Sequence, residues 1–149
     1  MRAVIQRVNR ARVAIGDEVI GEIGGGLLVL LGVAVGDGEK DALYILDKTL
    51  NLRIFEDADG KMNLSLLDVK GELMVVSQFT LYGDTRRGRR PSFIEAAPPE
   101  RADELYKFFV AEAGKAVSKV ATGRFQAMMD VELVNSGPVT IILDSSKSF

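Results

Sequence analysis

The chain has 149 residues, of which 47% are hydrophobic and 27% are charged, and its formal net charge is −2. A chain of this length can bury roughly 70% of its unfolded surface around one core, so we expect a single domain spanning residues 1–149. The composition favours neither a disordered chain nor a membrane span, and no apolar run approaches the ~20 residues that cross a bilayer. We therefore expect a cytoplasmic protein with no membrane partner.

The chain contains neither cysteine nor histidine. Disulfides, thiolate nucleophiles, the usual zinc sites and a Ser-His or Thr-His dyad are therefore excluded. We expect no metal and no cofactor. Any catalysis would depend on a shifted carboxylate or lysine, on backbone dipoles, or on a group of the substrate.

Alternating apolar and polar residues open the chain. The pattern runs from Val4 to Ile15, turns at Gly16-Asp17 and resumes from Val19 to Ile23, which predicts a β-hairpin. Residues 27–35 predict a buried central strand. Gly24-Gly25-Gly26 precedes a strand and not a helix, so it predicts a turn and not a phosphate-binding loop.

Apolar residues recur at helical spacing from Ala42 to Leu50 and predict a core-facing helix that ends at Asn51-Leu52. Asp37 or Asp41 is expected to serve as its N-cap. Asp57-Ala58-Asp59-Gly60 lacks the third acidic ligand and the distant glutamate of a calcium loop. It therefore predicts a hairpin turn.

The short apolar run Leu73–Val76 predicts a buried strand that delivers residues 77–81 at its end. Ser77, Gln78 and Thr80 supply three hydrogen-bonding side chains there. They could face a cleft together with their own backbone N–H groups, or they could form an ordinary polar strand end. The spacing alone does not decide between these two interpretations.

A second helix is predicted from Pro98-Pro99, which suits a first helical turn, to a point before Gly123, and its apolar stripe belongs to the core. Residues 129–134 and 139–143 then predict two strands, interrupted by residues 135–138. Many strands with two substantial helices that do not strictly alternate predict an α+β fold with mostly antiparallel pairing.

Gly137-Pro138 is most often an ordinary turn, and the sequence leaves open whether its peptide bond is cis. A proline between two apolar strands must lie at an edge, a bulge or a loop that exposes its carbonyls, and exposed carbonyls can recognise amines. Separately, Arg86, Arg87, Arg89 and Arg90 flank Gly88. They form either a solvated loop or a local contact for phosphate, such as an RNA end.

Taken together, the ordered motifs of the chain closely resemble the D-aminoacyl-tRNA deacylase family, also known as D-tyrosyl-tRNA deacylases. The resemblance spans essentially the whole chain and includes the opening strand Met1–Val8, Lys61–Asn63, Ser77–Thr80, Gly88–Phe93, Thr122–Phe125 and Asn135–Thr140. It implies a barrel-like core and a homodimer with the active site at the subunit interface. It also implies hydrolysis of the ester that joins a D-amino acid, or mischarged glycine, to the 3′ end of tRNA.

The resemblance also implies residue roles. Gln78, Phe79 and Thr80 would be catalytic, and the substrate would be bound by Arg7, Ser77, Phe125, Met129, Asn135, Gly137 and Pro138. Gly137-Pro138, in the cis form, would reach in from the partner subunit, and Arg7 would help to hold that loop. Phe125 and Met129 would help to form the pocket for the terminal adenosine, next to departures from the family pattern at Gln126 and Met128.

An aminoacyl ester is already labile, and the neighbouring ribose hydroxyl can assist the attack of water, so the missing histidine fits this chemistry. Backbone N–H groups of Phe79 and Thr80 are the expected oxyanion hole. Carbonyls of Gly137 and Pro138 would collide with an L side chain and leave a D side chain pointing to solvent.

Two alternatives remain open at this stage. One is a noncatalytic RNA-binding module that uses the arginine-rich stretch at residues 86–90. The other is a hydrolase of small esters or peptides with Thr80 as covalent nucleophile.

Overall fold

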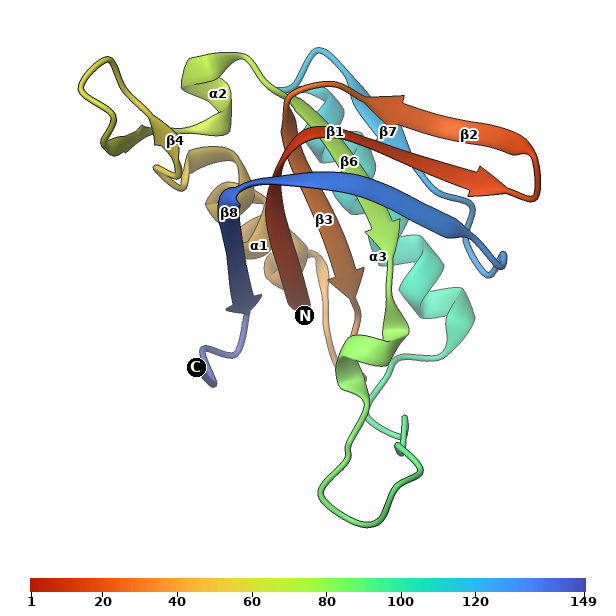
Figure 1. Cartoon of the computed structure of the whole chain (residues 1–149). Helices are drawn as coiled ribbons and strands as arrows, with labels where there is room; N and C mark the ends of the chain where they lie inside the picture. Colours follow the sequence, from red (N-terminus) through yellow and green to blue (C-terminus); the bar gives the residue numbers. More distant parts are fainter.

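A computed structural model describes residues 1–149 and is built on one large mixed sheet (Figure 1). The sheet has six strands in the order β2-β1-β3-β6-β7, with β8 also paired to β1, and β4 and β5 form a separate hairpin. The strands are β1 (Arg2–Ile15), β2 (Glu18–Ile23), β3 (Gly26–Gly32), β4 (Phe55–Glu56), β5 (Met62–Leu64), β6 (Glu72–Ser77), β7 (Val120–Thr122) and β8 (Asp130–Asp144). The helices are α1 (Glu39–Asn51), α2 (Leu66–Val69), the 3₁₀ turn η1 (Phe79–Tyr82) and α3 (Pro99–Gly114).

The sheet closes almost into a barrel. Strand β1 pairs antiparallel with β2, β3 and β8, whereas β3–β6 and β6–β7 are parallel. The outer strands β2 and β7 approach each other so closely that a Cβ on Gly21 would lie 2.7 Å from the carbonyl oxygen of Thr122. The predicted α+β class with mostly antiparallel pairing is confirmed, and the barrel-like core implied by the family resemblance is present.

The parallel strands β3 and β6 are the most deeply buried part of this sheet. All residues from Leu73 to Val76 in β6 are buried, and β3 is buried except at Leu30. Parallel strands that are covered on both faces carry continuous apolar runs, which explains why these two segments lack alternation. Strand β3 ends at Gly32, a little earlier than the predicted residue 35.

The two long helices cover the same side of the sheet and lie behind it in Figure 1. Their apolar stripes share one core cluster with β1, β3 and β6; α1 contributes Ile45, and α3 contributes Leu105 and Phe109. The α1 N-cap is Gly38, so the predicted cap at Asp37 or Asp41 was wrong. Asp41 instead occupies the third helical position, where its carboxylate accepts a hydrogen bond from the Gly38 N–H at 2.9 Å.

The C-terminal part of the chain differs from the two strands that were predicted. Residues 130–144 form one long strand, β8, which keeps its pairing with β1 on both sides of an irregularity. Val8 pairs with Asn135 and Gln6 pairs with Thr140, so residues 136–139 bulge out opposite Arg7. A bulge lets the proline sit in a strand without breaking the ladder on either side.

None of the helices is long and apolar enough to cross a membrane. Figure 1 also shows a loop that projects from the body between η1 and α3. It contains the arginine-rich stretch, and residues 85–95 are all exposed.

Two buried tyrosines make the stability of the fold depend on pH in the alkaline range. Burial raises the pKa of Tyr106 to about 12, and burial likewise raises the pKa of Tyr82. An unfolded tyrosine ionises near pH 10, so above that pH the unfolded chain loses protons that the folded chain keeps. We expect the free energy of unfolding to be unaffected by these groups below pH 10 and to fall between about pH 10 and 12.

Absorbance at 295 nm followed against pH measures this directly. At pH 10.5 the folded protein should show at most one ionised tyrosine of the three in the chain. Ionisation of all three at that pH, with the protein still folded by circular dichroism, would contradict the burial of Tyr82 and Tyr106.

Candidate active site

An open cavity of about 1020 Å³ lies at the end of β6. Its walls come from the β6–η1 junction, the segment before α3 and the loop between β7 and β8. The lining residues include Ser77, Gln78, Phe79 and Thr80, together with Val35, Phe93, Ile94, Phe125 and Met129. Six of the predicted site residues therefore lie on one cavity, although they come from two distant parts of the sequence.

The polar side of the cavity is built by the end of β6. Ser77 is paired with Leu31 of β3, and the Gln78 N–H donates to the Leu31 carbonyl at 2.8 Å. The chain then turns into η1, and Phe79 and Thr80 are both exposed. Because they are the first residues of this turn, their N–H groups have no acceptor within it and are available to a bound oxygen.

The side chains at this turn are linked to each other. The Gln78 side-chain amide donates to the Thr80 hydroxyl. A glutamine amide cannot take up a proton, so it orients the hydroxyl without activating it as a nucleophile.

The remaining walls are mainly apolar. The rings of Phe79 and Phe93 meet edge to face with centroids 5.0 Å apart. The ring of Phe125 lies 6.2 Å from that of Tyr106, whose hydroxyl donates to the Val75 carbonyl at 2.8 Å. Such a surface suits a flat aromatic group, such as a nucleobase, next to the polar turn.

Arg124 is the only ionisable side chain that lines the cavity. No carboxylate, lysine or tyrosine hydroxyl is therefore available there as a general base. Of the catalytic options left open by the sequence, the backbone dipoles and groups of the substrate remain. The chain also gathers no cluster of three or more acidic side chains that could hold a metal ion.

Two of the other predicted residues, Arg7 and Gly137, line a second, polar cavity of about 530 Å³, and Asn135 and Pro138 are their neighbours at the β8 bulge. The Gly137-Pro138 peptide bond is cis, and both residues are exposed. In the single chain, neither Gly137 nor Pro138 lines the cavity that contains Ser77–Thr80.

Arg7 connects this loop to the body of the protein. Its side chain is only 10% exposed, and it donates to the Ser136 carbonyl at 3.2 Å and to the Ile54 carbonyl at 2.8 Å. A Cβ on Gly137 would lie 2.7 Å from the Arg7 guanidinium, and the φ of Gly137 is +117°. Only glycine fits this position without moving Arg7 or the loop.

Asn135 closes the same loop from the other side. Its side-chain oxygen accepts a hydrogen bond from the Val139 N–H at 3.1 Å, and its amide donates to the Thr140 hydroxyl at 3.0 Å. These contacts make Asn135 a residue that shapes the loop.

Several lining residues were not predicted from the sequence, among them Val35, Ile94 and Arg124. Val35 and Ile94 are apolar and 64% and 83% exposed, an unusual state that only the folded chain reveals. Gln126 and Met128, the two positions predicted to depart from the family pattern, also line this cavity. Met128 is 91% exposed, and Gln126 adopts a left-handed backbone with φ +62°.

The loop before β8 is stabilised by a sulfur contact. The Arg124 N–H donates to the sulfur of Met129 at 3.2 Å, and a Cβ on Gly123 would lie 2.7 Å from the same sulfur. Met129 thus fixes the segment that presents Phe125 to the cavity.

Comparisons with known proteins agree on one family. A family model described as D-Tyr-tRNA(Tyr) deacylase matches residues 4–144. A protein of Roseiflexus sp. (strain RS-1) named D-aminoacyl-tRNA deacylase is 62% identical to this chain, over 98% of this chain and 94% of that protein. A protein of the same name from Clostridioides difficile (strain 630) is 60% identical, over the full length of both.

Solved structures show the same fold. The c-Myc DNA Unwinding Element Binding Protein superimposes with a TM-score of 0.92 at 42% identity, covering 97% of this chain and 98% of that one. A probable eukaryotic D-amino acid tRNA deacylase superimposes with a TM-score of 0.75 at 17% identity, over 95% of this chain and 97% of that one. The second likeness concerns the fold alone.

Proposed function

The chain belongs to the D-Tyr-tRNA(Tyr) deacylase family, and from this membership we infer that it is a D-aminoacyl-tRNA deacylase. It hydrolyses the ester bond between a D-amino acid and the 3′ end of tRNA and releases free D-amino acid and tRNA. Glycine mischarged on tRNA is proposed as a second substrate.

The observation that carries the site assignment is the cavity at Ser77–Thr80, which joins polar backbone to apolar walls and contains no general base. An activated ester needs positioning and polarisation more than a strong base. The alternative with Thr80 as covalent nucleophile is not favoured, because the side chain that contacts its hydroxyl is the amide of Gln78.

In the proposed mechanism the ester carbonyl oxygen binds at the N–H groups of Phe79 and Thr80, which stabilise the negative charge that develops on it. Water attacks the carbonyl carbon, and its oxygen forms the new C–O bond. The bond to the ribose oxygen breaks, and the proton lost by the water passes through the neighbouring ribose hydroxyl to that leaving oxygen. No protein side chain needs to change its protonation state.

Chiral selection is proposed to come from a second copy of the chain. Gly137 and Pro138 are exposed and lie apart from the cavity of their own protomer, so they are free to reach the cavity of a partner. Their carbonyls would face the α-carbon, bind the α-amino group and exclude an L side chain. Glycine has no side chain and would pass this filter.

The exposed apolar rim of the cavity supports the same homodimer. Val35, Phe79, Ile94 and Met128 are each more than half exposed, which is costly for a monomer and suits a covered interface. Phe125 and Met129 are proposed to hold the terminal adenosine, since both are apolar and line the same cavity as the polar turn.

The direct test compares D-tyrosyl-tRNA with L-tyrosyl-tRNA as substrates of the purified protein. We expect ester hydrolysis to be at least ~10-fold faster with the D substrate, and glycyl-tRNA to be hydrolysed as well. Equal rates on the two enantiomers would eliminate the carbonyl filter. Binding of tRNA without turnover would instead favour a noncatalytic RNA-binding module.

A further inference from the structure

The four clustered arginines are not equivalent in the structure. Arg86 is paired with Asp84 by two side-chain hydrogen bonds of 2.9 and 2.8 Å, and this pairing lowers the pKa of Asp84 to about 2. Arg87, Arg89 and Arg90 are exposed and take part in no ion pair or side-chain hydrogen bond. Arg86 therefore shapes the loop, and three guanidinium groups remain available to an external partner.

The base of this loop forms part of the cavity wall. Asp84 and Ser92 exchange two backbone hydrogen bonds of 2.8 and 3.0 Å, which join the two ends of the loop. On the side of this junction toward the body of the protein, Phe79 and Phe93 pack edge to face and both line the cavity. The three free arginines are thus carried by a loop that starts and ends at the mouth of the candidate active site.

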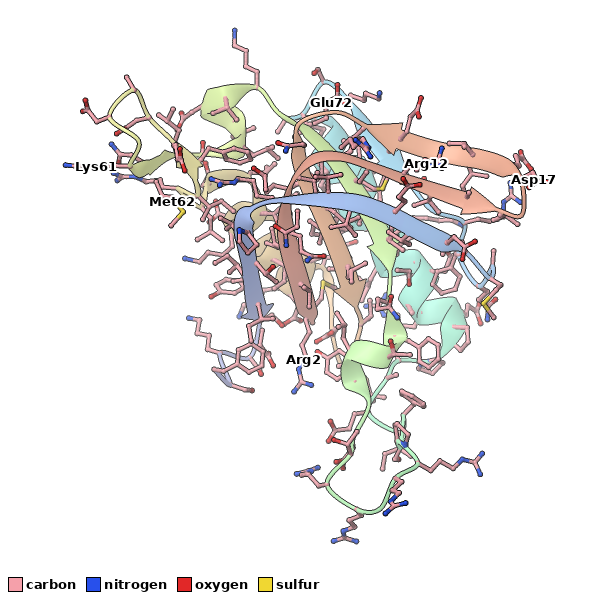
Figure 2. All side chains as sticks on the ribbon, in the orientation of Figure 1. Arg2, Arg12, Asp17, Lys61, Met62 and Glu72 are labelled. Carbon is pink, nitrogen blue, oxygen red and sulfur yellow. The ribbon has the colours of Figure 1, made fainter.

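The loop carries a net positive charge, whereas the rest of the chain is acidic. Residues 84–92 contain four arginines and one aspartate, a formal charge of +3, and the chain total of −2 leaves −5 for all other residues. Figure 2 shows the side chains of this loop spreading into solvent away from the body. Such a field attracts a polyanion to one place and disfavours its binding elsewhere on the surface.

We propose that Arg87, Arg89 and Arg90 bind backbone phosphates at the acceptor end of the tRNA while its 3′ ester occupies the adjacent cavity. This inference rests on the proposed function, since that function places the tRNA 3′ end in the cavity. Arginine on a projecting loop suits phosphate oxygens because its planar fork donates to two oxygens at once.

The test compares two substrates, D-tyrosyl-tRNA and 3′-(D-tyrosyl)adenosine, which carries the same ester but no phosphate. In the full-length triple variant Arg87→Gln/Arg89→Gln/Arg90→Gln, the ratio of kcat/KM for the tRNA to kcat/KM for the adenosine ester should fall at least ~10-fold. The loss of three phosphate contacts should also reduce the slope of log affinity for uncharged tRNA against log salt concentration by about 2 in magnitude.

A matched control removes three charges elsewhere, in the variant Arg10→Gln/Lys40→Gln/Lys61→Gln. All three residues are exposed and unpaired, and Lys61 lies at the tip of the β4–β5 turn, well away from the arginine loop in Figure 2. The control should retain the substrate ratio and the salt slope of the unchanged protein.

Three results would overturn the inference. The first is an unchanged kcat/KM ratio together with an unchanged salt slope in the arginine variant. The second is an equal loss of kcat/KM on both substrates, which would mean that the loop only shapes the cavity. The third is that the control variant changes the ratio and the slope as much as the arginine variant does. Failure of the proposed function looks different, because the unchanged protein would then hydrolyse neither substrate, while the salt-dependent binding of uncharged tRNA would still report on the loop.

Discussion

Replacing Phe79 with proline should lower kcat for D-tyrosyl-tRNA by about 10²- to 10³-fold relative to Phe79→Ala. Phe79 is the first residue of η1, a position that accommodates proline, and Gln78 before it has φ −143° and ψ +82°, outside the helical region that proline disfavours in the preceding residue. The variant therefore removes one N–H donor with little change in backbone shape. Removal of one oxyanion-hole donor typically costs a loss of this size.

Phe79→Ala is the matched control because it removes the same exposed ring and retains the N–H group. The comparison of the two variants isolates the donor, and kcat from single-turnover hydrolysis is the measurement. If both variants lose activity equally, the ring and not the backbone N–H matters, and the oxyanion-hole assignment is wrong.

The companion variant Thr80→Ala separates polarisation from covalent catalysis. It removes the hydroxyl that accepts from the Gln78 amide but keeps the Thr80 N–H. We expect it to retain kcat within about 10-fold, whereas loss of a covalent nucleophile would cost many orders of magnitude. Complete loss of turnover together with a trapped acyl-enzyme in the unchanged protein would reinstate Thr80 as nucleophile.

The second large effect concerns the stability of the protein. Arg7→Leu should lower the free energy of unfolding by about 2–5 kcal/mol, because it leaves the carbonyls of Ser136 and Ile54 without their donor in a largely buried place. The loop that carries Gly137 and Pro138 would lose its tether to β1. Urea unfolding at equal protomer concentration measures the change.

Arg12→Leu is the matched control from the same strand. Arg12 also pairs across to β8, through Glu132 at 2.6 Å, but its side chain is 53% exposed, compared with 10% for Arg7. Solvent screens such a surface pair, so the control should change the free energy of unfolding by no more than about 1 kcal/mol. Similar losses in the two variants would show that Arg7 contributes no more than an ordinary surface charge.

A mixture of two variants extends this comparison to the proposed dimer. Arg7→Leu damages the loop, and Phe79→Pro damages the cavity, so a mixed dimer would contain one site with both parts intact. Random exchange of subunits should restore activity toward about a quarter of the unchanged level. No gain on mixing, under conditions where subunits exchange, would contradict a site shared between protomers.

The sequence predicted the secondary structure well wherever the pattern was local. The opening hairpin, the helix that ends at Asn51 and the apolar strand at Leu73–Val76 were all confirmed, because each is defined by periodicity and turn residues within a few positions. The N-cap of α1 was wrong, since aspartate is favoured both at the cap and at the third helical position, and the local pattern does not distinguish them.

The continuity of β8 could not be predicted in the same way. A proline with polar neighbours normally ends a strand, and only the pairing of β1 on both sides of residues 136–139 shows that the strand continues through a bulge. The side-by-side parallel pairing of β3 and β6 was equally invisible, because a continuous apolar run specifies burial but not a neighbour.

By itself, the sequence determined which chemistry is excluded, since a chain without histidine and cysteine cannot build the usual acid-base or thiolate sites. It also marked Ser77–Thr80 and Asn135–Thr140 as breaks in apolar strands. The tertiary structure decided that Phe79 and Phe125 share one cavity, that Arg124 is its only ionisable wall residue, and that Arg86 is paired while its neighbours are free. These properties depend on contacts between segments far apart in the chain, which local patterns do not encode.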